Sequence, residues 1–111
     1  MSRIAIALFL LTGLSLAGCA EVYMTKTAKG FFPQTRPDDI EILMMKPDRP
    51  YIELASIATN NWKPGQIAKM HNALRAKAAP LGADAVVCFN SGIIGKYLWA
   101  TGAAIRYTDK Q

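Results

Sequence analysis

Residues 74–87 read LRAKAAPLGADAVV, and this stretch decides the fold because it passes from the end of a helix into a buried strand. An apolar stripe at helical spacing leads into it and consists of Ile67, Met70, Leu74, Ala78 and Leu81. Pro80 cannot donate to the carbonyl of Ala76, and Gly82 supplies a stop just beyond it, so the helix is predicted to end here. Residues 85–89, AVVCF, then form a continuous apolar run that is typical of a strand buried on both faces.

Two strands are predicted before this helix. Residues 40–45, IEILMM, begin as an alternation of apolar and polar side chains, and residues 51–58, YIELASIA, form a second strand-like segment. Residues 46–50, KPDRP, separate them as a turn, because two prolines and an aspartate break both strand and helix. Residues 59–61, TNN, are expected to end the second strand, with Asn61 as the N-cap of the helix.

The end of the chain predicts a final strand over residues 97–107, which is either one long strand or two short ones bent at Gly102. Residues 90–95 are expected to form the loop before it. The side chains at its even positions are small, which permits close approach by the helix: Ala100, Gly102 and Ala104. The order ββαββ predicts an α+β domain over residues 40–111, with a four-stranded sheet and one main helix packed on one face.

The bulky aromatic side chains of this last strand form a candidate partner surface, and they are Tyr97, Trp99 and Tyr107. Aromatic residues are enriched in the cores of interfaces, and a partner protein would dock on this sheet face or on an exposed sheet edge. The same row also suits the hydrophobic core of the domain, and the alternation alone leaves both interpretations open.

Residues 1–18 have the parts of a bacterial secretory signal. Ser2 and Arg3 form a short positive start, residues 4–17 are an uncharged apolar run, and small residues precede Cys19. A spanning helix needs roughly 20 apolar residues. The run is shorter than that, so a plain transmembrane anchor is the less favoured alternative.

Residues 16–19, LAGC, resemble the lipobox of bacterial lipoproteins. The resemblance implies a thioether-linked diacylglycerol on Cys19, cleavage before it, and acylation of the freed amine by a fatty acid such as palmitate. Several acyl chains together make membrane attachment durable. In many Gram-negative lipoproteins an aspartate after the cysteine causes retention at the inner membrane. Ala20 stands there in this chain, so the family rule implies an outer-membrane anchor and a domain that faces the periplasm.

Residues 19–39 are expected to form a lipidated tether. The segment is rich in polar residues and contains Pro33 and Pro37, without a sustained period, so it would stay extended and lift the domain off the bilayer. Phe31 and Phe32 are the exception, since they are expected to dock on the domain or to dip into lipid.

Charge and cysteine content limit the function further. The formal net charge is +5, but the basic residues are scattered, which indicates a solvated surface and not a nucleic-acid patch. With Cys19 lipidated, Cys88 has no partner for an intrachain disulfide, so it is either a buried thiol or the site of an intermolecular bond. Its place in an apolar run favours the buried thiol.

No catalytic or metal-binding constellation stands out. The residues weighed as metal ligands are not expected to converge, and they are Met44, Met45, Met70, His71 and Cys88. A nucleophile needs a base beside it, and the chain has a single histidine. We therefore expect no enzyme activity, no metal and no cofactor other than covalent lipid. Asp84, between Gly82 and the buried strand, is expected to bond backbone N–H groups of the turn and not to serve a partner.

Three stretches of the chain together resemble a broad group of small envelope proteins: residues 50–55 (PYIELA), residues 74–87 and residues 102–107 (GAAIRY). The group includes the Rcs-type outer-membrane stress-sensor lipoproteins and the YbjQ-like domains, which are described as heavy-metal-binding. The resemblance covers about residues 40–107 and implies an α+β domain. The sequence therefore predicts a lipid-anchored envelope protein with an interaction or structural role, and a sensory, ligand- or metal-binding lipoprotein is the alternative.

Overall fold

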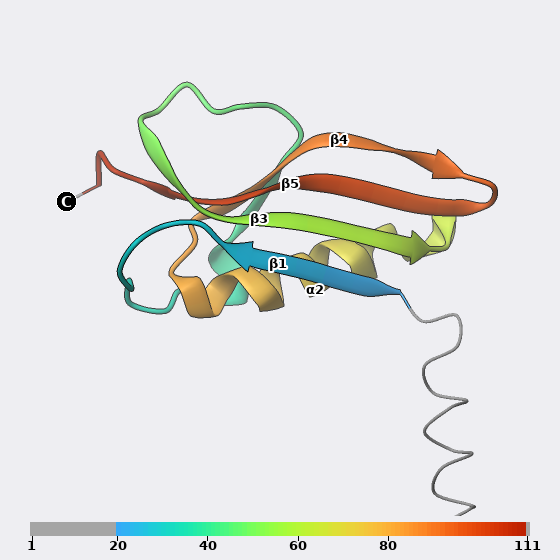
Figure 1. Ribbon diagram of the computed structural model, residues 1–111, viewed down its shortest axis with the longest axis horizontal. Coiled ribbons are helices and arrows are strands. Elements are labelled where there is room, and N and C mark those ends of the chain that lie inside the picture. Colours follow the sequence, from blue (N-terminus) through green and yellow to red (C-terminus); the bar gives the residue numbers. More distant parts are fainter. Residues whose placement is uncertain (1–19, 111) are drawn as a thin grey trace, which may run out of the picture.

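The computed structural model describes residues 20–110, which form an α+β domain with a single five-stranded sheet and one main helix (Figure 1). The strands are β1 (Glu21–Lys26), β2 (Glu41–Leu43), β3 (Tyr51–Trp62), β4 (Ala85–Ile94) and β5 (Tyr97–Tyr107). The helices are α2 (Ile67–Ala78) and the short 3₁₀ turns η1 (Pro37–Asp39), η2 (Pro64–Gln66) and η3 (Ala79–Leu81). The sheet order is β1-β3-β5-β4-β2, and α2 covers one face. The predicted fold class is therefore confirmed.

Helix α2 buries Met70, Leu74 and Ala78 against the sheet, as the apolar stripe predicts. The ends of that stripe behave differently, since Ile67 is about half exposed and Leu81 is only partly buried. Burial of a side chain such as Leu74 contributes roughly 1.5–3 kcal/mol of hydrophobic free energy. The helix ends at Ala78, and the turn η3 that follows contains Pro80, which agrees with the sequence prediction.

The final strand is continuous through Gly102, at the centre of the sheet between β3 and β4. A Cβ atom built at Gly102 would lie 1.8 Å from the carbonyl oxygen of Val87, so only glycine fits beside the irregular register of β4 between Cys88 and Asn90. The small residues Ala100 and Ala104 lie in the core cluster that contains the helix. The small side chains at these two positions therefore face the side of the sheet that α2 covers.

The prediction of four strands is wrong, because β1 adds a fifth from the segment that we expected to be a tether. Glu21–Lys26 pairs antiparallel with β3, from Glu21 beside Asn60 to Lys26 beside Ala55. Val22 and Met24 alternate with exposed residues and pack against the core. Two apolar side chains in six residues are a weak strand signal, and the hydrogen bonds of the pairing with β3 stabilise the strand instead.

The rest of the expected tether is also part of the fold. The Thr27 N–H donates to the Leu54 carbonyl, and the Thr35 N–H donates to the Ala79 carbonyl. Phe32 packs against the core and Phe31 is exposed, so only one of this pair docks on the domain. Gly82 has φ +83°, and a Cβ there would lie 2.7 Å from the Pro33 carbonyl oxygen and 2.8 Å from the Phe32 Cβ. The expected domain start at residue 40 is therefore too late.

Other boundaries differ as well. Only Glu41–Leu43 of the predicted strand 40–45 is in the sheet, where β2 lies parallel to the first residues of β4, and Met44 and Met45 are exposed. Strand β3 continues to Trp62 through the stretch that we expected to be a boundary. Asn61 takes φ +64°, which asparagine tolerates better than most residues, and the register with β5 shifts there.

A second, smaller core lies on the sheet face opposite α2 and consists of Ala85, Val87, Ala103, Ile105 and Tyr107. Leu43 and Tyr51 pack against it. The chain between β2 and β3 arches over this side of the sheet (Figure 1). Val86 packs in the helix-side core and Val87 in the opposite one, so the predicted burial on both faces is confirmed for residues 85–88, whereas Phe89 is half exposed.

Candidate functional site

The predicted lipid-attachment residue, Cys19, lies outside the residues that the structure describes, as do residues 1–18. Ala20 is the first described residue, and β1 begins at Glu21. Cys19 is therefore separated from β1 by one residue of the chain.

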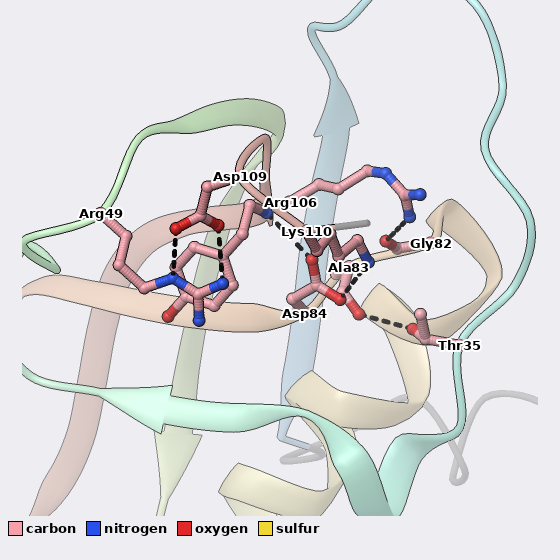
Figure 2. A network of polar contacts seen from close by, with 9 residues as sticks. Thr35, Arg49, Gly82, Ala83, Asp84, Arg106, Asp109 and Lys110 are labelled. Atoms are coloured by element: carbon pink, nitrogen blue, oxygen red, sulfur yellow. Dashed lines mark hydrogen bonds and ion pairs between the residues drawn. The ribbon is translucent and has the colours of Figure 1, made fainter.

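The three predicted partner-surface residues do not form one exposed row. Tyr107 is only 7% exposed and belongs to the smaller core. The Arg49 guanidinium lies over it, 3.7 Å from the ring centroid, and donates to both carboxylate oxygens of Asp109, with Nη2–Oδ1 2.7 Å and Nε–Oδ2 3.1 Å (Figure 2). Tyr107 is therefore a core residue under a cation, and its assignment to a partner surface is wrong.

Tyr97 is exposed and Trp99 is partly buried near the turn between β4 and β5. A Cβ at Gly92 would lie 3.0 Å from the indole Nε1 of Trp99, so the missing side chain at Gly92 makes room for that ring on the neighbouring strand. Tyr97 is 37% exposed and pairs with Ile94 across the turn. These two aromatic residues stay available to a partner.

Residues 90–95, which we expected to form a loop, continue β4 to Ile94 and begin the turn at Gly95. Strands β4 and β5 form a continuous hairpin, and Gly95 takes φ +63° as the first residue of a two-residue turn, a position that favours glycine. We define the hairpin tip as Ile93, Ile94, Gly95, Lys96 and Tyr97. The sequence signal was present in Gly95-Lys96 between two apolar stretches.

An apolar cavity of about 350 Å³ lies between the first half of α2 and the β4–β5 hairpin. Its lining includes four of the residues weighed as metal ligands, namely Met44, Met70, His71 and Cys88. Met45 is not among the lining residues. Within residues 20–110, no three His, Cys, Asp or Glu side chains are grouped as metal ligands.

The two titratable side chains that line this cavity, Cys88 and His71, favour their neutral forms. Burial raises the pKa of the Cys88 thiol, which is 5% exposed, and therefore favours the neutral thiol over the nucleophilic thiolate. Burial, with a smaller effect of Arg75, lowers the pKa of His71 and keeps its imidazole neutral. A cavity of this size and lining suits a small apolar ligand or an apolar side chain of a partner.

Asp84 lies in a polar network that joins the helix-to-strand turn to the end of β5 (Figure 2). Its carboxylate accepts the Tyr107 N–H at 2.9 Å and the Lys110 ammonium at 2.7 Å. On the same turn, the Thr35 hydroxyl donates to the Ala83 carbonyl at 2.5 Å. Asp84 thus binds backbone as we expected, although its partner lies at the end of β5 and not within the turn.

Between Ala20 and Lys110, the chain forms no helix with the length and apolar content needed to span a membrane.

Comparisons with known proteins show the fold and nothing finer. No protein-family model matches the chain, and no curated protein matches it. Among solved structures, the chain is similar to the crystal structure of a Francisella virulence factor, FvfA, in its orthorhombic form. The TM-score is 0.55 and the identity 14%, and the match covers 78% of this chain and 97% of that chain. At this identity the likeness establishes a shared α+β architecture only.

Proposed function

We propose that this chain is a lipid-anchored protein of the bacterial cell envelope, attached through Cys19 to the outer membrane, with a non-catalytic interaction role on the periplasmic side. The lipobox-like LAGC at residues 16–19 carries the proposal. The position of β1 supports it, because a folded strand that begins two residues after Cys19 matches a mature protein that starts at that cysteine.

Mass spectrometry of the protein purified from membranes tests the anchor. We expect a mature chain that begins at Cys19 and carries diacylglycerol and an amide-linked acyl group. Cys19→Ala should keep residues 1–18 and carry no lipid, whereas Cys88→Ala, which changes the only other cysteine, should be processed and lipidated normally. An intact Met1 end or an unmodified Cys19 in the native protein would contradict the proposal.

Separation of inner and outer membranes tests the proposed localisation. By the family rule, the native protein should sediment with the outer membrane, and Ala20→Asp should move it to the inner membrane. Recovery of the native protein in the inner-membrane fraction would remove the outer-membrane part of the proposal and leave the lipid anchor standing.

The interaction role is supported by an open sheet edge. Within residues 20–110, β2 pairs with β4 only as far as Val87, and no described strand covers the outer edge beyond it. This stretch of β4 contains Phe89, which is half exposed, and has no charged side chain of the kind that blocks edge-to-edge pairing. A partner protein can add a strand at such an edge.

Photo-crosslinking in intact cells tests this edge. A photoreactive residue in place of Phe89 should give a discrete adduct with another envelope protein, and the same residue in place of Asp48, in the loop between β2 and β3, should not. Equal adducts at both positions, or none at Phe89, would contradict partner binding at the β4 edge.

The alternative is a sensory or ligand-binding lipoprotein, and the apolar cavity beside α2 favours it. A small apolar ligand or a soft metal in that cavity would contact Met70 and Cys88. Titration with a soft metal or an apolar dye should then protect Cys88 from thiol reagents. Unchanged reactivity of Cys88 at saturating concentrations would count against this alternative.

A further inference from the structure

Four chain segments meet at one end of the domain, which we call the anchor end: the start of β1, the last residues of β3, the turn η2 and the hairpin tip (right-hand side of Figure 1). The strand register places them together, since Glu21 lies beside Asn60 and Trp62 lies beside Leu98. A shallow hollow is lined jointly by η2 and the hairpin tip.

The hairpin tip exposes apolar side chains. Ile93 is 63% exposed and Ile94 is 72% exposed, and consecutive strand residues point to opposite faces of the sheet. Both faces of the tip are therefore apolar, with the partly exposed Tyr97 beside them. Two isoleucines in water at a hairpin turn add nothing to the domain core, so their exposure calls for an apolar partner.

Acidic residues are distributed unevenly along the domain, whereas basic residues occur at both ends. The anchor end carries Lys63 and Lys96, and Lys69 follows on the first turn of α2. The one acidic residue of the anchor end is Glu21, which accepts a hydrogen bond from the Tyr23 hydroxyl. The other acidic residues lie towards the opposite end, at or near the starts of β2, β3 and β4 and the end of β5: Asp38, Asp39, Glu41, Asp48, Glu53, Asp84 and Asp109. The apolar tip thus has mostly basic neighbours.

The chain enters the fold at this same end. Two peptide units separate Cys19 from Glu21, so their Cα atoms are within about 7 Å of each other. If Cys19 carries lipid, as the proposed function has it, the bilayer begins where the anchor end is. Apolar side chains with a tyrosine and lysines beside them are the composition found at membrane interfaces.

We infer that the hairpin tip is a membrane-contacting wedge for an anionic phospholipid surface. Ile93 and Ile94 enter the boundary between headgroups and acyl chains, and Tyr97 lies at the headgroup level. Lys63 and Lys96 bind headgroup phosphates. Together with the lipid on Cys19, the wedge fixes the orientation of the domain, with β2, the β2–β3 loop and the end of β5 turned away from the bilayer. This inference rests on the proposed lipid anchor.

The test uses the full lipidated protein in vesicles of phosphatidylglycerol and phosphatidylethanolamine. An environment-sensitive fluorophore on Ile94→Cys should emit at shorter wavelength and be quenched several-fold more by nitroxide-labelled lipid than the same fluorophore on Asp48→Cys. The Cys88 thiol is buried and the Cys19 thiol would be bonded to lipid, so labelling is confined to the new cysteine. Equal quenching at positions 94 and 48 would overturn the wedge.

A second pair of variants keeps the label off the wedge. With the fluorophore on Asn60→Cys, at the anchor end, Ile93→Asp with Ile94→Asp should remove most of the quenching. Met44→Asp with Met45→Asp, which changes another exposed apolar pair, should leave it unchanged. Loss of quenching in both pairs, or in neither, would contradict the role of the isoleucines.

The outcomes separate this inference from the function on which it rests. If mass spectrometry finds no lipid on Cys19, the proposed function fails. If the protein is lipidated but the label at position 94 stays in water, only the wedge fails. Equal quenching on phosphatidylcholine would overturn the role of Lys63 and Lys96. If the label is shielded from water in cells but not in protein-free vesicles, the proposed contact with lipid is wrong and the hairpin tip contacts a protein partner.

Discussion

Substitution of Gly102 by alanine should destabilise the domain strongly, because Gly102 lies in the central strand and faces backbone on the neighbouring strand. The new Cβ would be 1.8 Å from the Val87 carbonyl oxygen, 2.8 Å from its carbonyl carbon and 3.0 Å from the Cα of Cys88. Ordinary contact begins near 3.4 Å, so β4 and β5 would have to separate by more than 1 Å. All three contacts are with backbone, and no rotamer change can relieve them.

The size of the effect follows from what must move. Overpacking that side-chain shifts relieve costs about 1–3 kcal/mol. At Gly102 the relief requires movement of two paired strands with buried neighbours on both faces, so we expect a loss of about 3 kcal/mol or more in the free energy of unfolding. Urea unfolding, followed by circular dichroism, measures it directly.

Gly65→Ala is the matched control. Gly65 lies in the turn η2, its φ is negative, and a Cβ there has no neighbour within 4 Å. We expect a change in unfolding free energy within about 0.5 kcal/mol. If Gly102→Ala also stayed within that range, the close approach of β4 to β5, and with it the structural basis of the hairpin, would be refuted.

Three further outcomes are expected. Because burial raises the pKa of Cys88, its thiol should react much more slowly with thiol reagents in the native protein than in urea, and equal rates would show that the cavity is open to them. Gly92→Ala should change the fluorescence of Trp99, since the new methyl group meets the indole at 3.0 Å, and an unchanged spectrum would contradict that contact. The hydrogen bond from Arg49 lowers the pKa of Asp109 below its ordinary 3.8. The Arg49–Asp109 pair therefore stabilises the folded state above pH 3.8, and this stabilisation is lost as the pH falls through the lowered pKa of Asp109. The difference in urea midpoint between the native protein and Asp109→Asn should vanish in acid and persist at pH 7.

Interactions between residues close in sequence were sufficient to predict the centre of the fold. Three features depend only on residues close in sequence, and the structure confirms them: the apolar stripe on α2, the helix stop at Pro80 and Gly82, and the apolar run of β4. The small residues Ala100 and Ala104 of β5 lie on the face that α2 covers, as their alternation predicts. These elements could be predicted from spacing and turn chemistry alone.

The missed features depend on partners distant in sequence. Strand β1 has two inward apolar residues and becomes a strand because β3 offers an edge some 30 residues away. Alternation places Tyr107 in a row with Trp99 and leaves surface and core both open, because it cannot show that the β2–β3 loop brings Arg49 over the ring. The cavity needed the same long-range information, since its lining residues come from three separate stretches of chain.

The position of β1 changes what a lipid on Cys19 would do. A flexible tether of about 20 residues would let the domain sample many orientations above the bilayer, so that no particular surface of the domain would face the membrane. A lipid anchor one residue from a paired strand would restrict the domain to orientations in which the start of β1 faces lipid. The hairpin tip, η2 and the end of β3 would then lie close to the headgroups, whether or not they bind them. Partner binding at the β4 edge is compatible with this arrangement, because that edge runs away from the tip towards Val87 and can accept a strand presented from the periplasm.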